Sequence, residues 1–167
     1  ITCRDWSSDV CSSDLALESF DKAVELSPGA SGPLCRRALA KSDFGDYAGA
    51  DEDYGRALKL SPSDAKILVA RANVRCAMGL FQKAEADCDK AIGLNPSDAT
   101  AWICRANAYM ALSQFSKAEA DCDKVIGLNP QQPFAYSMRG HAKMALGRSD
   151  EARSEERRVG KECRSRW

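Results

Sequence analysis

The side chains best able to do chemistry are the cysteines and aspartates of a motif that occurs twice. Cys88 lies between two aspartates in the sequence DCD, and Cys122 does so again 34 residues later. Thiolates and carboxylates at such close spacing resemble the ligands of a metal ion. Tyr54 and Phe20 occupy the same place at earlier steps of this spacing, where an aromatic ring would pack between helices. The motif therefore favours buried thiols over metal ligands.

The aspartates that flank these cysteines are expected on solvated helix faces. Lysines stand close to them in the sequence, and exposed ion pairs of this kind contribute about 0.2–1 kcal/mol each. The expected members are the aspartates Asp87, Asp89, Asp121 and Asp123, and the lysines Lys83, Lys90, Lys117 and Lys124.

The rest of the chain offers no recognisable set of catalytic residues. The single histidine, His141, is not accompanied by a serine and an aspartate in a pattern that predicts a triad. Gly79 and Gly147 resemble glycines of helix turns, and no G-x-x-x-x-G-K pattern predicts a phosphate loop. We therefore expect no catalytic residue, no cofactor and no metal site, and predict that the chain is not an enzyme.

Both ends of the chain resemble translated sequencing adapters. Residues 153–167 read RSEERRVGKECRSRW, which is what a common library adapter encodes, and residues 5–15, DWSSDVCSSDL, resemble the opposite adapter. Such segments belong outside fold reasoning. We expect residues 1–15 and 153–167 to be non-native, and residues 16–152 to be a fragment of a longer protein.

The remaining cysteines and the charge balance indicate a reducing compartment. Residues 16–152 hold an odd number of widely spaced cysteines without a C-x-x-C pair: Cys35, Cys76, Cys88, Cys104 and Cys122. This pattern favours reduced thiols and predicts a cytoplasmic or other reducing intracellular location. Lys and Arg number 24, as do Asp and Glu, so no charge excess predicts nucleic acid or a membrane surface as a partner. No apolar run approaches the roughly 18 residues that cross a bilayer.

A 34-residue repeat organises the chain. Pro28, Pro62, Pro96 and Pro130 follow one another at this interval, and residues 65–98 share nineteen of 34 residues with 99–132. The apolar residues follow the helical period. We predict helix pairs at 31–44 with 47–60, at 65–78 with 81–94, and at 99–112 with 115–128. A lone second helix is predicted from residue 16, a first helix at 133–146, and the start of another helix at 147–152.

These repeats resemble the tetratricopeptide repeat. Small residues recur where that family has them, and an aromatic residue opens each second helix. The matching residues are Ala38, Ala72, Ala106 and Gly140, then Ala50, Ala84 and Ala118, then Tyr47, Phe81 and Phe115, then Ala57 and Ala91, while Val125 departs from the pattern. The resemblance implies an all-α, right-handed α-solenoid of antiparallel helix pairs. It divides the chain into a truncated repeat at 16–30, repeats at 31–64, 65–98 and 99–132, and a truncated repeat at 133–152.

The resemblance also implies a binding groove, because the first helices of this family line a concave surface. The residues that it places there, as candidates for contact with a partner, are Lys66, Val69, Asn73, Thr100, Ile103, Asn107, Met110, Phe134, Ser137 and His141. This lining mixes apolar groups and amides with one lysine, which suits an extended or helical peptide. Asn73 and Asn107 take equivalent places and could pair with a ligand backbone; the alternative is that they bond neighbouring helices or water.

One known ligand of the family is not expected. Its chaperone-binding members grip a terminal carboxylate with Lys and Asn in one first helix, Asn in the next, and Lys and Arg in a third. In one register the matching places hold Cys35, Leu39, Ala70, Thr100 and Cys104, and in the other they hold Val69, Asn73, Cys104, Phe134 and Met138. Only Asn73 fits, so a carboxylate would lack its charge-assisted hydrogen bonds.

The sequence thus predicts a scaffold that binds a peptide or helix of another protein, with no nucleic-acid or membrane partner. An alternative is a recruiting or regulatory repeat region of a larger enzyme whose catalytic domain is absent from this fragment. Weak self-association through uncapped end helices is a third possibility.

Overall fold

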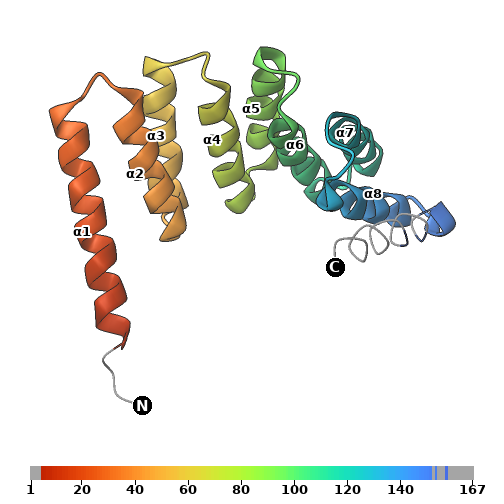
Figure 1. Ribbon diagram of the computed structural model, residues 1–167, viewed down its shortest axis with the longest axis horizontal. Coiled ribbons are helices and arrows are strands. Elements are labelled where there is room, and N and C mark those ends of the chain that lie inside the picture. The colour runs from red at the N-terminus through yellow and green to blue at the C-terminus, as the bar shows by residue number, and fades with distance from the viewer. Residues whose placement is uncertain (1–4, 152, 154–156, 158–167) are drawn as a thin grey trace.

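The computed structural model describes residues 5–151, 153 and 157, and side chains from residue 15 onward. Its helices, in order, are α1 (Asp5–Leu26), α2 (Ser31–Asp43), α3 (Tyr47–Leu60), α4 (Ala65–Ala77), α5 (Phe81–Leu94), α6 (Ala99–Ala111), α7 (Phe115–Leu128) and α8 (Pro133–Ala145). They stand side by side in a curved row from α1 to α8 (Figure 1). The described residues contain no strand, so the predicted all-α solenoid of helix pairs is confirmed.

Local sequence signals fix where several helices begin. The Asp64 carboxylate accepts hydrogen bonds from the backbone N–H groups of Lys66, at 2.9 Å, and Ile67, at 3.4 Å. Asp98 caps α6 in the same way through the N–H of Thr100. These bonds satisfy N–H groups that have no partner within the helix. The predicted helix starts at these two positions are therefore confirmed.

The turn inside each repeat uses a left-handed residue at one recurring position. Gly45, Gly79 and Gly147 have φ angles of 84°, 74° and 78°, and Ser113, at the same place in its repeat, has a φ angle of 58°. The residue that follows donates its N–H to a carbonyl near the end of the first helix, as Leu80 does to Arg75. A glycine adopts this conformation without strain, whereas serine does not.

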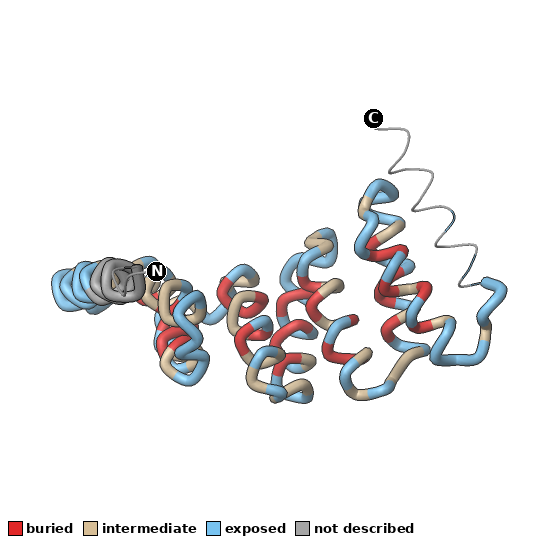
Figure 2. Tube along the Cα trace, turned by 90° about the horizontal axis from the view of Figure 1, so that it is seen from below, coloured by how far each residue is buried: buried red, intermediate tan, exposed pale blue. Residues whose placement is uncertain are grey.

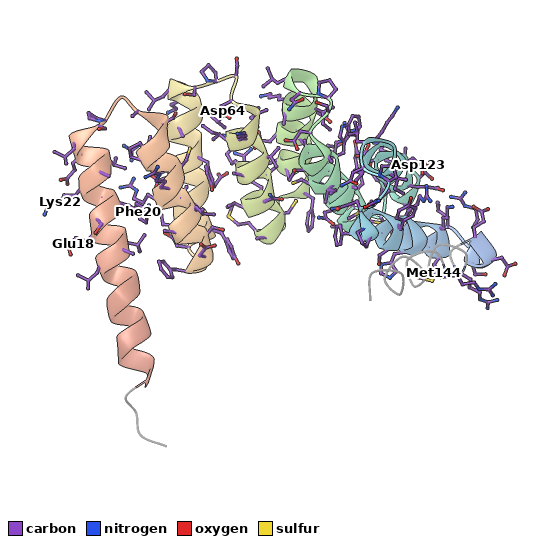
Figure 3. The ribbon with its side chains drawn as sticks, in the orientation of Figure 1. Glu18, Phe20, Lys22, Asp64, Asp123 and Met144 are labelled. Atoms are coloured by element: carbon purple, nitrogen blue, oxygen red, sulfur yellow. The ribbon has the colours of Figure 1, made fainter. Side chains whose placement is uncertain are left out.

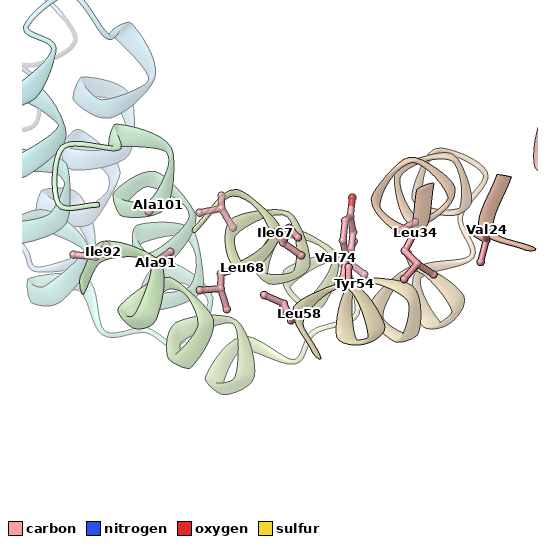
Figure 4. Packing of buried hydrophobic residues seen from close by; sticks show 14 residues of the cluster. Val24, Leu34, Tyr54, Leu58, Ile67, Leu68, Val74, Ala91, Ile92 and Ala101 are labelled. Carbon is pink, nitrogen blue, oxygen red and sulfur yellow. The ribbon is translucent and has the colours of Figure 1, made fainter. Parts of the chain in front are cut away.

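Small residues allow the helices to pack closely. Ala38, Ala72, Ala84 and Ala106 have no exposed surface, which lets neighbouring backbones approach each other. The largest core cluster runs from Val24 in α1 to Ala101 in α6 (Figure 4). Buried residues lie where neighbouring helices meet, and exposed residues lie on their outer sides (Figure 2). Two further clusters of buried residues lie between α4 and α8, so that core packing follows the stack from α1 to α8, as in other solenoids.

The first helix begins earlier than expected. The sequence predicts a helix from Ala16, but α1 starts at Asp5 and passes through the adapter-like residues 5–15. No proline or glycine occurs between Asp5 and Leu26 to end a helix. On the part with described side chains, Phe20 points toward α2 while Glu18 and Lys22 point away (Figure 3). No described helix is both long and apolar enough to span a bilayer.

The left-handed serine gives a stability prediction. Replacing Ser113 with glycine removes a conformational cost of roughly 1–2 kcal/mol, from which the greater freedom of glycine in the unfolded chain subtracts roughly 0.5–1 kcal/mol. We expect Ser113→Gly to raise the free energy of unfolding in urea, and Gly79→Ser, the reverse change one repeat earlier, to lower it. A change of the same sign in both variants would contradict this account of the turn.

Candidate functional site

The predicted groove residues lie on α4, α6 and α8, and most of them are open to solvent. Asn73, Asn107, Ser137 and His141 are exposed, as are Lys66, Thr100 and Phe134, whereas Ile103 and Met110 are half-buried. Two of these first helices, α4 and α6, are in contact with each other. The exposed residues thus form a stripe that runs from one first helix to the next, which we call the groove stripe.

Val69 is the exception among the candidates. Its side chain is 5% exposed and belongs to the same core cluster as Ile67 and Leu68. It therefore supports the groove stripe from below and offers a ligand almost no surface.

At the start of the stripe, Lys66 borders an open depression of about 580 Å³ that Asp64 and Asp98 also line.

Several cysteines lie beneath this surface. Cys88 and Cys104 are buried in one cluster, with Cys76 packed against it. A hydrogen bond with Cys104, together with burial, raises the pKa of Cys76. Burial, followed by the charges of Asp121 and Asp123, raises the pKa of Cys122 to about 12. Such thiols carry little thiolate at neutral pH and are poor nucleophiles.

The two DCD motifs have the buried cysteines that the repeat spacing predicts. Cys88 and Cys122 are 0% and 1% exposed. Within the described part of the chain, no group of three or more His, Cys, Asp or Glu side chains is arranged to hold a metal ion.

A row of buried ion pairs runs along the solenoid. Arg37, Arg71 and Arg105 in the first helices each grip the aspartate 16 residues later, which lies in the second helix of the same repeat. In the middle pair, Nε and Nη2 of Arg71 donate to the two carboxylate oxygens of Asp87 at 2.8 and 2.6 Å. We call the three pairs, Arg37–Asp53, Arg71–Asp87 and Arg105–Asp121, the arginine–aspartate ladder.

The ladder corrects the expectation that these aspartates are solvated. Asp53, Asp87 and Asp121 are 1%, 2% and 4% exposed, and Asp87 and Asp121 pair with arginines rather than with nearby lysines. The planar guanidinium matches a carboxylate with two parallel hydrogen bonds, which a lysine cannot do. The signal was present in the sequence, because both the arginines and the aspartates recur at 34-residue intervals.

The other aspartate of the motif links one repeat to the next. Nη1 of Arg105 donates to Asp89 at 2.6 Å, and Nη1 of Arg139 donates to Asp123 at 2.5 Å. Asp89 and Asp123 are exposed, as predicted, but their partners are arginines of the following repeat. Asp123 lies on α7 in Figure 3. Each such bond, which we call a cross-repeat contact, joins a second helix to the first helix that follows it.

Pairing of opposite charges in the ladder offsets the cost of burying its carboxylates. Burial alone would raise the pKa of Asp53, but hydrogen bonds from Arg37 and Lys41 outweigh it and hold that pKa below its ordinary value. The hydrogen bond to Asp53 likewise raises the pKa of Arg37. Both groups therefore stay charged at neutral pH. Removing one member would leave the other buried without a partner, which costs about 3–5 kcal/mol.

Comparison with known proteins identifies the repeat unit. Two family profiles described as tetratricopeptide repeat match the chain, one over residues 35–99 and one over residues 99–132. A comparison with curated proteins found no match.

Solved structures share the fold. The crystal structure of MamA is 20% identical, with a TM-score of 0.87 over 99% of this chain and 97% of that one. The first TPR of Spaghetti (RPAP3), bound to the HSP90 peptide SRMEEVD, is 26% identical, with a TM-score of 0.69 over 70% of this chain and 93% of that one. The Arabidopsis OM64 TPR domain is 25% identical, with a TM-score of 0.66 over 68% and 94%.

The two aspartates of one DCD motif allow a matched test of the ladder. Asp87→Ala leaves Arg71 and Arg75 without their shared carboxylate, so we expect the free energy of unfolding in urea to fall by about 3–5 kcal/mol. Asp89→Ala removes a partner that is half exposed, and we expect a loss below about 1 kcal/mol. Equal losses would show that burial of the pair does not determine its contribution.

The pKa of Asp53 predicts a dependence on pH. Because this pKa lies below the ordinary value of 3.8 in the folded chain, the stabilisation is complete above that value and is lost as the pH falls through the folded pKa. We expect the stability difference between the wild type and Asp53→Asn to shrink between about pH 5 and about pH 1. Urea unfolding of both chains across this range measures it. A difference that grew on acidification would contradict the assignment.

Proposed function

The chain belongs to the tetratricopeptide-repeat family, and we propose that it is a non-catalytic scaffold that binds a peptide or helix of another protein along its groove stripe. The family resemblance to domains such as the RPAP3 repeat, which carries a bound peptide, supports a protein-interaction role. The groove-binding mode rests on the chemistry of this chain.

The observation that carries the proposal is an exposed stripe almost free of charge. Asn73, Asn107 and Ser137 offer hydrogen-bond donors and acceptors to a peptide backbone, and exposed Phe134 offers apolar surface. The arginines of the ladder lie elsewhere on the same helices. Arg71 and Asn73 are two residues apart and so point to opposite sides of α4. The strongest charges are thus paired on one side, and the other side is available for a largely neutral ligand.

The ligand is expected to differ from a peptide with an acidic C-terminus. In the register in which Asn73 fits, the places where chaperone-binding repeats need cations hold Val69, Phe134 and Met138, and Val69 and Met138 are only 5% and 6% exposed. Buried apolar side chains cannot donate hydrogen bonds to a carboxylate. An internal segment or amphipathic helix with amide and apolar contacts fits this lining better.

The same residues favour a role without catalysis. Four cysteines, Cys35, Cys76, Cys104 and Cys122, have raised pKa values, because burial and neighbouring thiols or carboxylates disfavour the thiolate. His141 lies exposed on the groove stripe and suits contact with a ligand. The five cysteines whose side chains are described are free thiols, which is consistent with action in a reducing compartment, and we propose that this is the cytoplasm.

The two asparagines give the test of this proposal. Peptides selected with the whole chain from a random display library would be measured by calorimetry against the wild type and Asn73→Ala/Asn107→Ala. Each lost hydrogen bond costs about 0.5–1.5 kcal/mol, so we expect Kd to rise by about five- to 150-fold. Gln82→Ala, an exposed change on α5, serves as the control and should leave Kd unchanged. Unchanged binding by the double variant would overturn the proposed contact.

A further inference from the structure

The cross-repeat contact is missing at one junction of the solenoid. Nη1 of Arg37 donates to Asp21, and the corresponding atoms of Arg105 and Arg139 donate to Asp89 and Asp123. At the equivalent place before Arg71, the repeat has Gly55. In the described part of the chain, Nε and Nη2 of Arg71 bond Asp87, and Nη1 forms no hydrogen bond.

Gly55 leaves room for the missing group. A Cβ atom built on Gly55 would meet only Nη1 of Arg71, at 3.8 Å, which is an ordinary van der Waals distance. The side chain of Arg71 is 16% exposed, close to the 17% of Arg105, whose Nη1 reaches a surface aspartate. The space above Gly55 therefore leads from solvent to a guanidinium N–H, and we call it the Gly55 notch.

We propose that the Gly55 notch binds a carboxylate, supplied by an Asp or Glu side chain of a partner protein. The chain itself displays the bound geometry, since a carboxylate occupies the equivalent place at three other junctions at 2.5–2.7 Å from Nη1. A charge-assisted hydrogen bond of this kind is about twice as strong as a neutral one.

The surroundings favour a carboxylate over a phosphate. Asp87 accepts from both Arg71 and Arg75, and Asp51 accepts from Nε of Arg75 at 2.7 Å. These two carboxylates already balance the two guanidinium charges. A single negative charge at Nη1 is tolerated at the other junctions, whereas a doubly charged phosphate would meet repulsion from Asp51 and Asp87.

This site is separate from the groove stripe. Arg71 lies on the side of α4 opposite Asn73, so a partner could occupy the stripe and the notch at the same time. The notch is argued from the ladder geometry and not from the groove stripe. A test that finds no carboxylate bound at the notch would therefore not contradict the proposed peptide binding along the groove stripe.

The first experiment uses acetate as the probe and the whole chain. Sodium acetate is titrated into the protein at constant ionic strength, which sodium chloride maintains. Binding is monitored by NMR through the ¹⁵N signals of the arginine side chains. We expect a saturable shift at Arg71 and none at Arg105, whose Nη1 is already paired. Gly55→Asp should abolish the shift, while Gly55→Ala, which adds only a Cβ, should retain it. Asp89→Ala should create a second responsive arginine at Arg105.

The second experiment tests the source of the carboxylate. Acetylated and amidated peptides with a single Glu among neutral residues are compared with the same peptides carrying Gln, and preference for Glu should disappear in Gly55→Asp. Absence of an acetate-specific shift at Arg71, or an equal shift in Gly55→Asp, would overturn the site. Acetate binding without any preference for Glu would overturn its assignment to a protein side chain.

Discussion

A buried carboxylate held by a bidentate arginine lies inside each complete helix pair of this solenoid. Asp53, Asp87 and Asp121 are almost fully removed from water, and a carboxylate in such a place is tolerated only with a full set of donors. The arginine must therefore extend from the facing helix at one fixed position along the helix axis. This requirement restricts how far the two helices of a pair can slide past each other, which the packing of alanines alone does not do, since small residues tolerate several registers.

The ladder also determines what the rest of the surface can be used for. The arginines of the ladder occupy one side of the first helices and pair with aspartates of the second helices, and the cross-repeat contacts of Arg105 and Arg139 extend the network to the neighbouring repeat. Because the arginines of the ladder are paired there, the exposed residues of the groove stripe on the opposite side are mainly amides, hydroxyls and apolar groups. The paired charges that hold the helices together and the residues proposed to bind a ligand thus lie on opposite faces of the same helices, rather than in separate domains.

The repeat period was enough to predict the helices from α2 to α8 and the turns between them. The helices that begin after Asp64 and Asp98, and the break between helices at Ser113, lie where the predicted helix bounds place them. The burial of Asp87 was missed because lysines lie nearby in the sequence, and local spacing suggested exposed pairs. Its true partner, Arg71, is 16 residues away and comes into reach only when the two helices pack. The burial of Val69 likewise depends on neighbouring helices and not on its place along α4.

The repeats of one chain can be aligned with one another. A position at which one repeat differs is therefore informative when nearby residues of that repeat compensate for the difference. Gly55 removes an aspartate that the other junctions keep, yet the junction is not left without a link. Arg75, one turn after Arg71, bonds Asp51, one turn before Gly55, and also reaches Asp87. Tyr109 occupies the place of Arg75 in the next repeat, where the ordinary contact is present. The cross-repeat link has therefore moved by one helical turn, which preserves the cohesion of the stack and leaves Nη1 of Arg71 available to a ligand.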